Sequence, residues 1–143
     1  ADEEIIKKYL VDNNITAIKT GSGLYYVITQ AGSGENAKPG QEVTMNYTGK
    51  LLDGTSFDSN QDPKFGHTEP FKFQLGSGQV IKGWDEGIAL LNKGAKAKLI
   101  IPSPLGYGTR AMPGNPNNEK GIPANSILVF DVEMLGAKDM ATK

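Results

Sequence analysis

The chain has 143 residues, 38% of them hydrophobic, and its 15 lysines and arginines almost balance its 16 aspartates and glutamates. This length suits one domain with a sizeable core, and the net charge of −1 argues against a nucleic-acid-binding protein. Because cysteine is absent, disulfides, thiolate zinc sites and cysteine nucleophiles are excluded. No apolar run is long enough to span a membrane, and no secretory signal peptide is visible.

The first 21 residues predict a short helical arm. Three acidic residues are followed by apolar residues spaced i, i+1, i+4 and i+5, a pattern typical of an amphipathic helix that ends near Asn13. A helix this short needs a surface to pack on. We expect it to dock on its own domain, and the alternative is a partner or a second copy of the chain.

Beyond the arm, the pattern indicates an antiparallel sheet of about five or six strands. Residues 30–41 predict a turn-rich loop, and the dipeptide Asp53-Gly54 predicts a tight turn. The residues from Gly136 onward are expected to fray. The segments with strand patterns are 24–28, 43–52, 56–59, 71–75, 95–101 and 126–135.

One short helix is predicted between two of these strands, and it contains the only tryptophan, Trp84. The apolar spacing around Trp84 is closest to that of a buried helix of about two or three turns, and Gly94 is its expected left-handed cap. Gly83 and Gly87 lie four residues apart inside this helix. Glycine is unfavourable there, so the pair suits either a helix that something bulky must approach closely or a short helix held by packing. Trp84 is then either a core anchor or the floor of an apolar pocket.

The distribution of aromatic residues favours the pocket. Tyr107 lies between two glycines in a Pro- and Gly-rich loop over residues 102–125, and loops of that length are usually functional or mobile. Simpler roles remain open: a core aromatic for Tyr47, a turn cap for Asp58 and a loop anchor for Tyr107. The aromatic residues placed to surround one apolar site are Tyr47, Phe57, Phe71, Trp84, Tyr107 and Phe130.

The sequence gives little support for other kinds of catalytic or binding site. There is no phosphate-binding loop, metal-ligand cluster or nucleotide fingerprint. A hydrolase that uses a serine and the single histidine, His67, is conceivable, but the sequence contains no nucleophile elbow.

The motifs closely resemble those of the FKBP-type peptidyl-prolyl cis-trans isomerases, the macrolide-binding immunophilins. The resemblance implies an α+β fold, in which a twisted antiparallel half-barrel sheet wraps around the Trp84 helix. It divides the chain into an N-terminal helical arm (1–21), an isomerase domain (22–136) and a C-terminal tail (137–143). The matching segments, in order, are 43–58 (with Asn46-Tyr47-Thr48-Gly49), 70–87, 106–108 and 122–135.

The resemblance also implies the activity and the site. The chain is expected to speed rotation about X–Pro bonds and to assist protein folding, without a cofactor. Its expected partners are proline-containing polypeptides and macrolide inhibitors, and a non-catalytic chaperone or scaffold of the same fold is the alternative. The implied catalytic residues are Tyr47, Asp58 and Tyr107, and the implied substrate-binding residues are Phe57, Phe71, Val80, Ile81, Trp84, Ile122 and Phe130.

Arms of this kind resemble those that precede the domain in bacterial extracytoplasmic members. Together with the start at Ala1 in place of methionine, the arm favours a periplasmic or outer-membrane lipoprotein over a cytoplasmic protein.

Three departures from the family pattern bear on the site. The segment 60–69 is longer than in the minimal domain and lacks the arginine that usually pairs with the pocket aspartate. The loop over residues 109–121 is extended, and Gly121 stands where an apolar residue is common. Gln79 occupies a position that is often glutamate.

Overall fold

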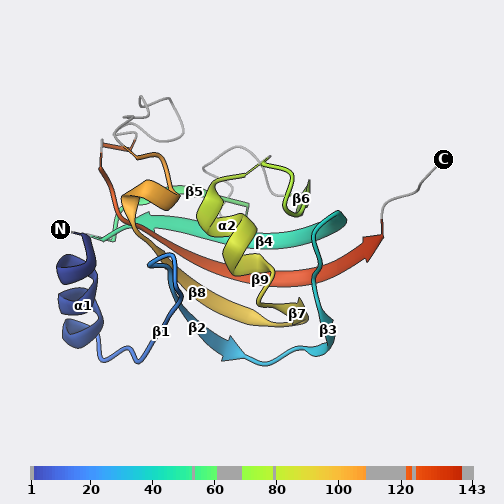
Figure 1. Ribbon diagram of the computed structural model, residues 1–143, viewed down its shortest axis with the longest axis horizontal. Coiled ribbons are helices and arrows are strands. Elements are labelled where there is room, and N and C mark those ends of the chain that lie inside the picture. Colours follow the sequence, from blue (N-terminus) through green and yellow to red (C-terminus); the bar gives the residue numbers. More distant parts are fainter. Residues whose placement is uncertain are drawn as a thin grey trace.

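The computed structural model describes residues 2–52, 54–60, 69–78, 80–108, 122–123 and 125–139. This part contains two α-helices, one short 3-10 helix and nine strands (Figure 1). In chain order they are α1 (Asp2–Asp12), β1 (Ile18–Lys19), β2 (Tyr25–Gln30), β3 (Ser33–Asn36), β4 (Gln41–Leu51), β5 (Ser56–Ser59), β6 (Phe71–Gln74), α2 (Lys82–Ile88), β7 (Asn92–Lys93), β8 (Lys96–Ile101), η2 (Ser103–Leu105) and β9 (Leu128–Asp139).

The strands form two antiparallel sheets. The principal sheet has the order β1-β2-β8-β9-β4-β5, with β6 also paired to β4, and the smaller sheet joins β3 to β7. The long central pair β4 and β9 extends from Gln41 opposite Asp139 to Leu51 opposite Leu128, with one register shift between Thr44 and Met45. In Figure 1 the principal sheet curves around α2. The predicted α+β fold, an antiparallel sheet around one short helix with a second helix at the N-terminus, is therefore confirmed.

Strict alternation along β4 and β9 creates the main core. Successive side chains of a strand point to opposite faces of the sheet, and every second residue of β4 from Val43 to Gly49 is buried. On β9 the predicted apolar face lies in the same core cluster, which also contains Trp84 and Ile88 of α2. The β9 residues of this face are Leu128, Phe130, Val132 and Met134.

The N-terminal helix covers the opposite face of the sheet. Ile6 and Leu10 of α1 are buried in a second apolar cluster with Ile100 of β8 and Val129 of β9. The alternation of β9 explains the two clusters, because Val129 faces away from its neighbours Leu128 and Phe130. The arm thus docks on its own domain, as expected from its apolar spacing.

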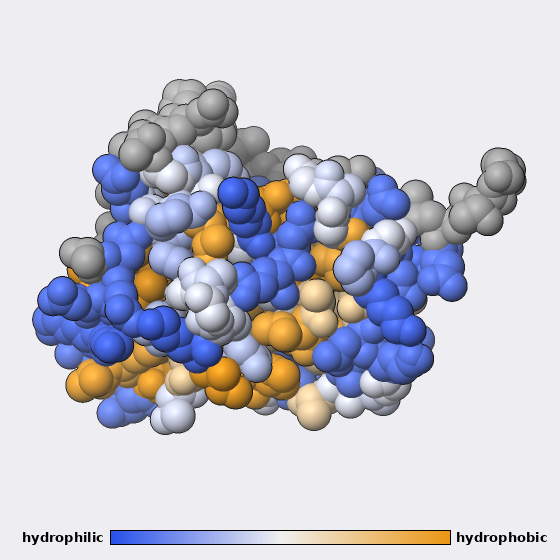
Figure 2. All heavy atoms as spheres, viewed as in Figure 1, coloured by the Kyte–Doolittle hydropathy of each residue, from blue (hydrophilic) through white to orange (hydrophobic). Residues whose placement is uncertain are grey.

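The surface seen in Figure 2 is largely polar, with hydrophobic residues exposed along its lower edge. In the matching view of Figure 1 this edge carries β1 and β2. The exposed apolar residues of these strands are Ile18 and Ile28. Among the described residues, no helix has both the length and the apolar character needed to cross a membrane.

The predicted end of the Trp84 helix is wrong. The helix ends at Ile88, and Ala89 follows in a right-handed conformation. Gly94 does adopt a left-handed φ of 88°, but it lies in the turn between β7 and β8. The local apolar pattern continued through Leu91, which is buried in the core as part of the connection to β7. Periodicity alone could not separate this connection from the helix.

Two loop predictions are also wrong. The segment 30–41 contains β3, which pairs with β7 across a register shift. The frayed tail expected from Gly136 onward instead continues β9 as far as Asp139, where the Gln41 side-chain amide donates to the Asp139 carboxylate at 3.1 Å. Strand β3 and the last three residues of β9 are exposed and carry no large apolar side chain, so long-range pairing stabilises them without a hydrophobic signature in the sequence.

Two glycines let α2 approach β8 closely. A Cβ atom added at Gly83 would lie 2.7 Å from Cγ2 of Ile101, and one added at Gly87 would lie 2.9 Å from Cδ2 of Leu99. Both isoleucine and leucine side chains are fully buried. The glycine pair predicted to permit bulky packing therefore faces the strand that supports the helix.

We expect Gly83→Ala to destabilise the fold by about 1 to 3 kcal/mol, because overpacking a tight core outweighs the better helix propensity of alanine. Urea denaturation measures this change. Gly21→Ala is the matched control, since a Cβ there meets nothing within 4 Å, and it should change stability by a few tenths of a kcal/mol at most. A Gly83→Ala protein as stable as the parent would contradict the close approach.

Candidate functional site

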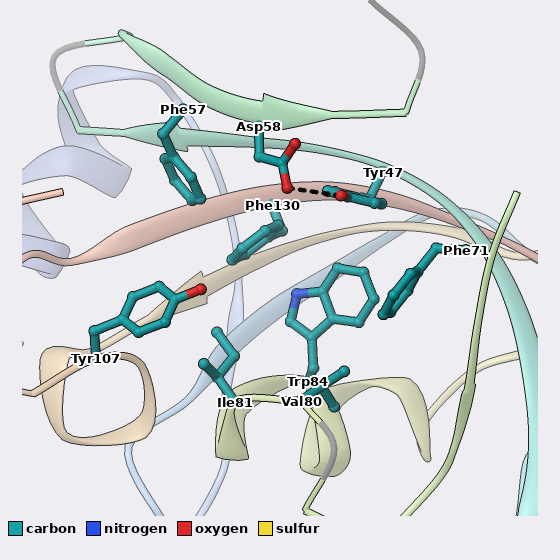
Figure 3. Close-up of a pocket in the computed structure, with 9 residues that line it drawn as sticks. All are labelled: Tyr47, Phe57, Asp58, Phe71, Val80, Ile81, Trp84, Tyr107 and Phe130. Carbon is teal, nitrogen blue, oxygen red and sulfur yellow. Dashed lines mark hydrogen bonds between the residues drawn. The ribbon is translucent and has the colours of Figure 1, made fainter. Parts of the chain in front are cut away.

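A cavity of about 400 Å³ opens between α2 and the concave face of the sheet. It collects nine of the ten residues that the sequence analysis named as site residues (Figure 3). Its lining is predominantly apolar, with polar groups from a few side chains, which is the usual character of a ligand site. The lining residues are Tyr47, Phe57, Asp58, Phe71, Val80, Ile81, Trp84, Tyr107 and Phe130.

Ile122, the tenth of these residues, lies outside the cavity lining. It is buried, with 6% of its surface exposed, and belongs to the core cluster. The structure therefore places Ile122 in the main core, and its predicted contact with substrate stays a prediction.

Trp84 forms the floor of the cavity. Its ring is 4% exposed and meets Tyr47 and Phe130 edge-to-face, each with a centroid distance of 5.3 Å. Such pairs contribute roughly 0.5–1.5 kcal/mol beyond their buried area. The indole Nε1 is buried without a hydrogen-bond partner in the described part of the chain. A buried polar group in that state is uncommon and is often found at a functional site.

Gly49 shapes the wall beside this floor. The Phe57 and Phe130 rings meet edge-to-face at 5.4 Å, directly over Gly49. A Cβ on Gly49 would lie 2.6 Å from Cζ of Phe57 and 2.7 Å from Cε1 of Phe130. Gly49 ends the motif Asn46-Tyr47-Thr48-Gly49, but its role cannot be predicted from the sequence, because the need for it appears only when two distant aromatic rings come together.

The polar edge of the pocket is built on Tyr47 and Asp58. The Tyr47 hydroxyl donates to Oδ2 of Asp58 at 2.7 Å, and Oδ1 accepts from the backbone N–H of Ser59 at 2.8 Å. Asp58 lies on β5 and Tyr47 on β4, which pair in antiparallel register. The Ser59 N–H of its own strand and the hydroxyl of Tyr47 therefore hold the Asp58 carboxylate at the edge of the pocket.

Two tyrosine hydroxyls of the pocket stay protonated well into alkaline solution. Burial is the largest cause that raises the pKa of Tyr47 far above its usual value, and the hydrogen bond to Asp58 and its charge act in the same direction. Burial, followed by the charge of Asp58, also raises the pKa of Tyr107. Both groups can therefore donate hydrogen bonds at neutral pH, but neither is suited to lose its proton.

Asn60 supports Tyr47 from behind, and sequence analysis missed it. Only 1% of its surface is exposed. Its Oδ1 accepts from the Tyr47 backbone N–H at 2.8 Å, while its Nδ2 donates to the carbonyls of Met45 and Glu69, both at 3.1 Å. In the sequence Asn60 only begins a polar, irregular segment, so no local signal distinguished this buried amide from a loop residue.

The rim of the pocket is held by Asp85 on α2. Its two carboxylate oxygens accept from the backbone N–H groups of Gly76 and Gly78, at 2.9 and 3.2 Å. These glycines belong to the turn that leads from β6 to the rim residues Val80 and Ile81. Ile81 itself caps α2 in an extended conformation, with φ −61° and ψ 153°.

Tyr107 closes the pocket from the side opposite Phe71 (Figure 3). It follows η2 in a tight turn, and its hydroxyl points into the cavity in Figure 3. The predicted long loop thus begins with an ordered turn that delivers one side chain to the site. Gln79, His67 and residues 109–121, on which other expectations rested, lie outside the described residues.

We expect Tyr47 and Tyr107 to keep their protons at a pH of about 10, where a model tyrosine ionises. Because the folded-state pKa values are raised, the folded chain retains protons that the unfolded chain loses. The stabilisation is complete below a pH of about 10 and falls as the pH rises above it. Ultraviolet titration of tyrosinate, combined with denaturation at each pH, measures both effects. Loss of an early titration step in Tyr47→Phe or Tyr107→Phe would contradict the assignment.

A family model and sequence relatives with known names both match this chain. A family model described as FKBP-type peptidyl-prolyl cis-trans isomerase matches residues 33–135. The chain is 52% identical over 98 residues to the peptidyl-prolyl cis-trans isomerase Fkbp12 of Drosophila melanogaster. This alignment covers 68% of this chain and 82% of that protein. It is 44% identical to FK506-binding protein 4 of Mycosarcoma maydis, over 94% of this chain but only 34% of the relative's length.

Solved structures agree with the sequence relatives. The crystal structure of FkpA from Escherichia coli has a TM-score of 0.78 and 38% identity, covering 96% of this chain and 60% of that one. The crystal structure of AtFKBP13 has a TM-score of 0.75 and 35% identity, covering 85% of this chain and 98% of that one. The chain belongs to the FKBP-type peptidyl-prolyl cis-trans isomerase family.

Proposed function

We propose that this chain is a peptidyl-prolyl cis-trans isomerase that accelerates rotation about X–Pro bonds in polypeptides and thereby assists protein folding. The observation that carries the proposal is the cavity of about 400 Å³ floored by Trp84. Its aromatic walls suit a proline ring, and its few polar groups suit the carbonyls on either side of that ring.

The reaction demands little chemistry from the protein. Rotation about an amide bond has a barrier of about 18–20 kcal/mol, because the planar form is stabilised by resonance. The twisted transition state has lost that resonance, and its carbonyl is less polar than that of the planar amide. A dry apolar pocket therefore favours the twisted form over a planar amide that water solvates well. A ~10⁶-fold acceleration would need about 8 kcal/mol of this preference.

We assign orienting roles to the polar groups. The Tyr107 hydroxyl and the Ile81 backbone N–H are placed to donate to substrate carbonyls, and Asp58 is held at the edge by Tyr47. No covalent intermediate is required, since no bond breaks. Proton transfer from the tyrosines is disfavoured because their pKa values are raised. The aromatic side chains supply the apolar surface, and Ile122 lies in the main core.

Macrolide inhibition and a bacterial origin are narrower proposals. An apolar pocket with convergent hydroxyl and carboxylate groups suits a macrolide as well as a proline ring. Bacterial membership is supported by the Escherichia coli FkpA structure, which covers 96% of this chain with a TM-score of 0.78. The division into an arm (1–21), an isomerase domain (22–136) and a tail (137–143) is also a proposal, and the family match over residues 33–135 lies within the proposed domain.

A protease-coupled assay of cis-to-trans conversion in a short X–Pro peptide tests the proposal. Uncatalysed exchange takes tens to hundreds of seconds, so acceleration is easily resolved. We expect the chain to accelerate the exchange, a macrolide inhibitor to abolish the acceleration, and Tyr107→Phe to reduce kcat/KM roughly tenfold through loss of one hydrogen bond in the transition state.

The controls separate catalysis from binding. Circular dichroism should show that Tyr107→Phe remains folded, because the substitution removes only a hydroxyl. A folded protein that binds the macrolide but does not accelerate the exchange would overturn the isomerase proposal. That outcome would favour the alternative, a non-catalytic chaperone or scaffold of the same fold.

A further inference from the structure

The turn that carries Tyr107 is hydrogen-bonded to Asp2, the first residue of the N-terminal helix α1. Both the backbone N–H and the hydroxyl of Ser103 donate to one carboxylate oxygen of Asp2, at 2.8 and 2.6 Å. The two residues are 101 positions apart in the sequence. Ser103 is buried, with 7% of its surface exposed. In Figure 1 the start of α1 lies beside the turn that follows β8.

This contact supplies a hydrogen-bond acceptor that the turn itself lacks. The first N–H groups of a helix lack partners within the helix and are usually capped by a side-chain oxygen just before it. Before η2 that position is Pro102, which makes no side-chain cap. Asp2 supplies the missing acceptor from a distant element. Its negative charge is also favourable at the start of a helical turn.

Ser103 also restrains the two residues that flank Tyr107. Its carbonyl accepts from the N–H groups of Gly106 and Gly108, at 3.0 and 2.8 Å. These are the two residues that flank Tyr107 in the chain. Gly108 has a left-handed φ of 60°, a conformation that favours glycine and bends the chain sharply. Ser103 is therefore bonded to Asp2 on one side and to both neighbours of Tyr107 on the other.

The position of Asp2 is itself fixed by packing. Ile6 and Leu10, one and two turns further along α1, are buried against the outer face of the sheet. Glu3 is paired with Lys19 on β1. The carboxylate thus comes from a docked helix, and its place relative to the turn depends on how that helix lies on the sheet.

We propose that Asp2 is a positioning residue for Tyr107, so that the N-terminal arm determines how accurately one wall of the pocket is placed. Its effect on catalysis rests on the isomerase function proposed above. Asp2 touches no substrate in this scheme. It fixes Ser103, and Ser103 fixes the turn that aims the Tyr107 hydroxyl into the cavity.

The test compares Asp2→Ala with two matched variants. Glu4→Ala removes another carboxylate from the same first turn of α1, at an exposed position. Asp2→Asn keeps a carbonyl oxygen that can accept both bonds. Each protein is assayed for kcat and KM with an X–Pro peptide and for its urea midpoint. Each is also labelled with 3-fluorotyrosine, and the Tyr107 fluorine resonance is assigned by its loss in Tyr107→Phe.

We expect Asp2→Ala to shift or broaden the Tyr107 resonance and to lower kcat/KM by about threefold to tenfold, because the turn loses two charge-assisted hydrogen bonds and only part of that loss reaches the Tyr107 hydroxyl. Asp2→Asn should restore most of both properties, and Glu4→Ala should leave both unchanged. The resonance is the decisive readout, because a loss of stability alone would leave it in place under conditions where the chain is folded.

The proposal is overturned if Asp2→Ala leaves the Tyr107 resonance unchanged, or if Glu4→Ala alters it equally. Failure of the isomerase function is a separate result. An unmodified chain without isomerase activity whose Tyr107 resonance still responds to Asp2→Ala would retain the positioning role and refute the catalytic one.

Discussion

The close packing of α2 on β8 is the constraint on which the rest of the site depends. Because Gly83 and Gly87 bring the helix backbone onto Ile101 and Leu99, Trp84 projects into the hollow of the sheet while remaining 4% exposed. The antiparallel sheet supplies the walls, since alternate residues of β4 and β9 face the helix. The pocket is thus a gap in the main core, between elements that the core already holds rigid.

The polar groups of the site are few and firmly held. Asn60 fixes the backbone of Tyr47, Tyr47 and Ser59 fix Asp58, and Asp85 fixes the turn that leads to the rim. None of these contacts sets up a nucleophile or a proton relay. They place hydrogen-bond donors and one carboxylate around an apolar floor, an arrangement suited to orienting a peptide while its own amide bond rotates.

Local pattern predicted the parts of the structure that bury apolar side chains. Periodicity predicted the alternation in β4 and β9 and the Trp84 helix. The family motifs named nine residues that the structure then places around one cavity. Features that depend on distant pairing were missed: the polar strand β3, the last residues of β9 and the buried amide of Asn60. The space that Gly49 leaves for two rings and the bond from Asp2 to Ser103 also join distant segments, so neither has a local signature.

The central claim is that the pocket acts by desolvation and orientation, without proton transfer. The solvent deuterium isotope effect on kcat/KM, measured for an X–Pro peptide from roughly pH 6 to pH 9, tests it most directly. The account predicts an isotope effect close to one and a flat pH profile, because the pKa values of both pocket tyrosines are raised and no proton moves in the transition state. An isotope effect of about two or more, with a bell-shaped profile, would contradict it and require an acid–base group in the pocket.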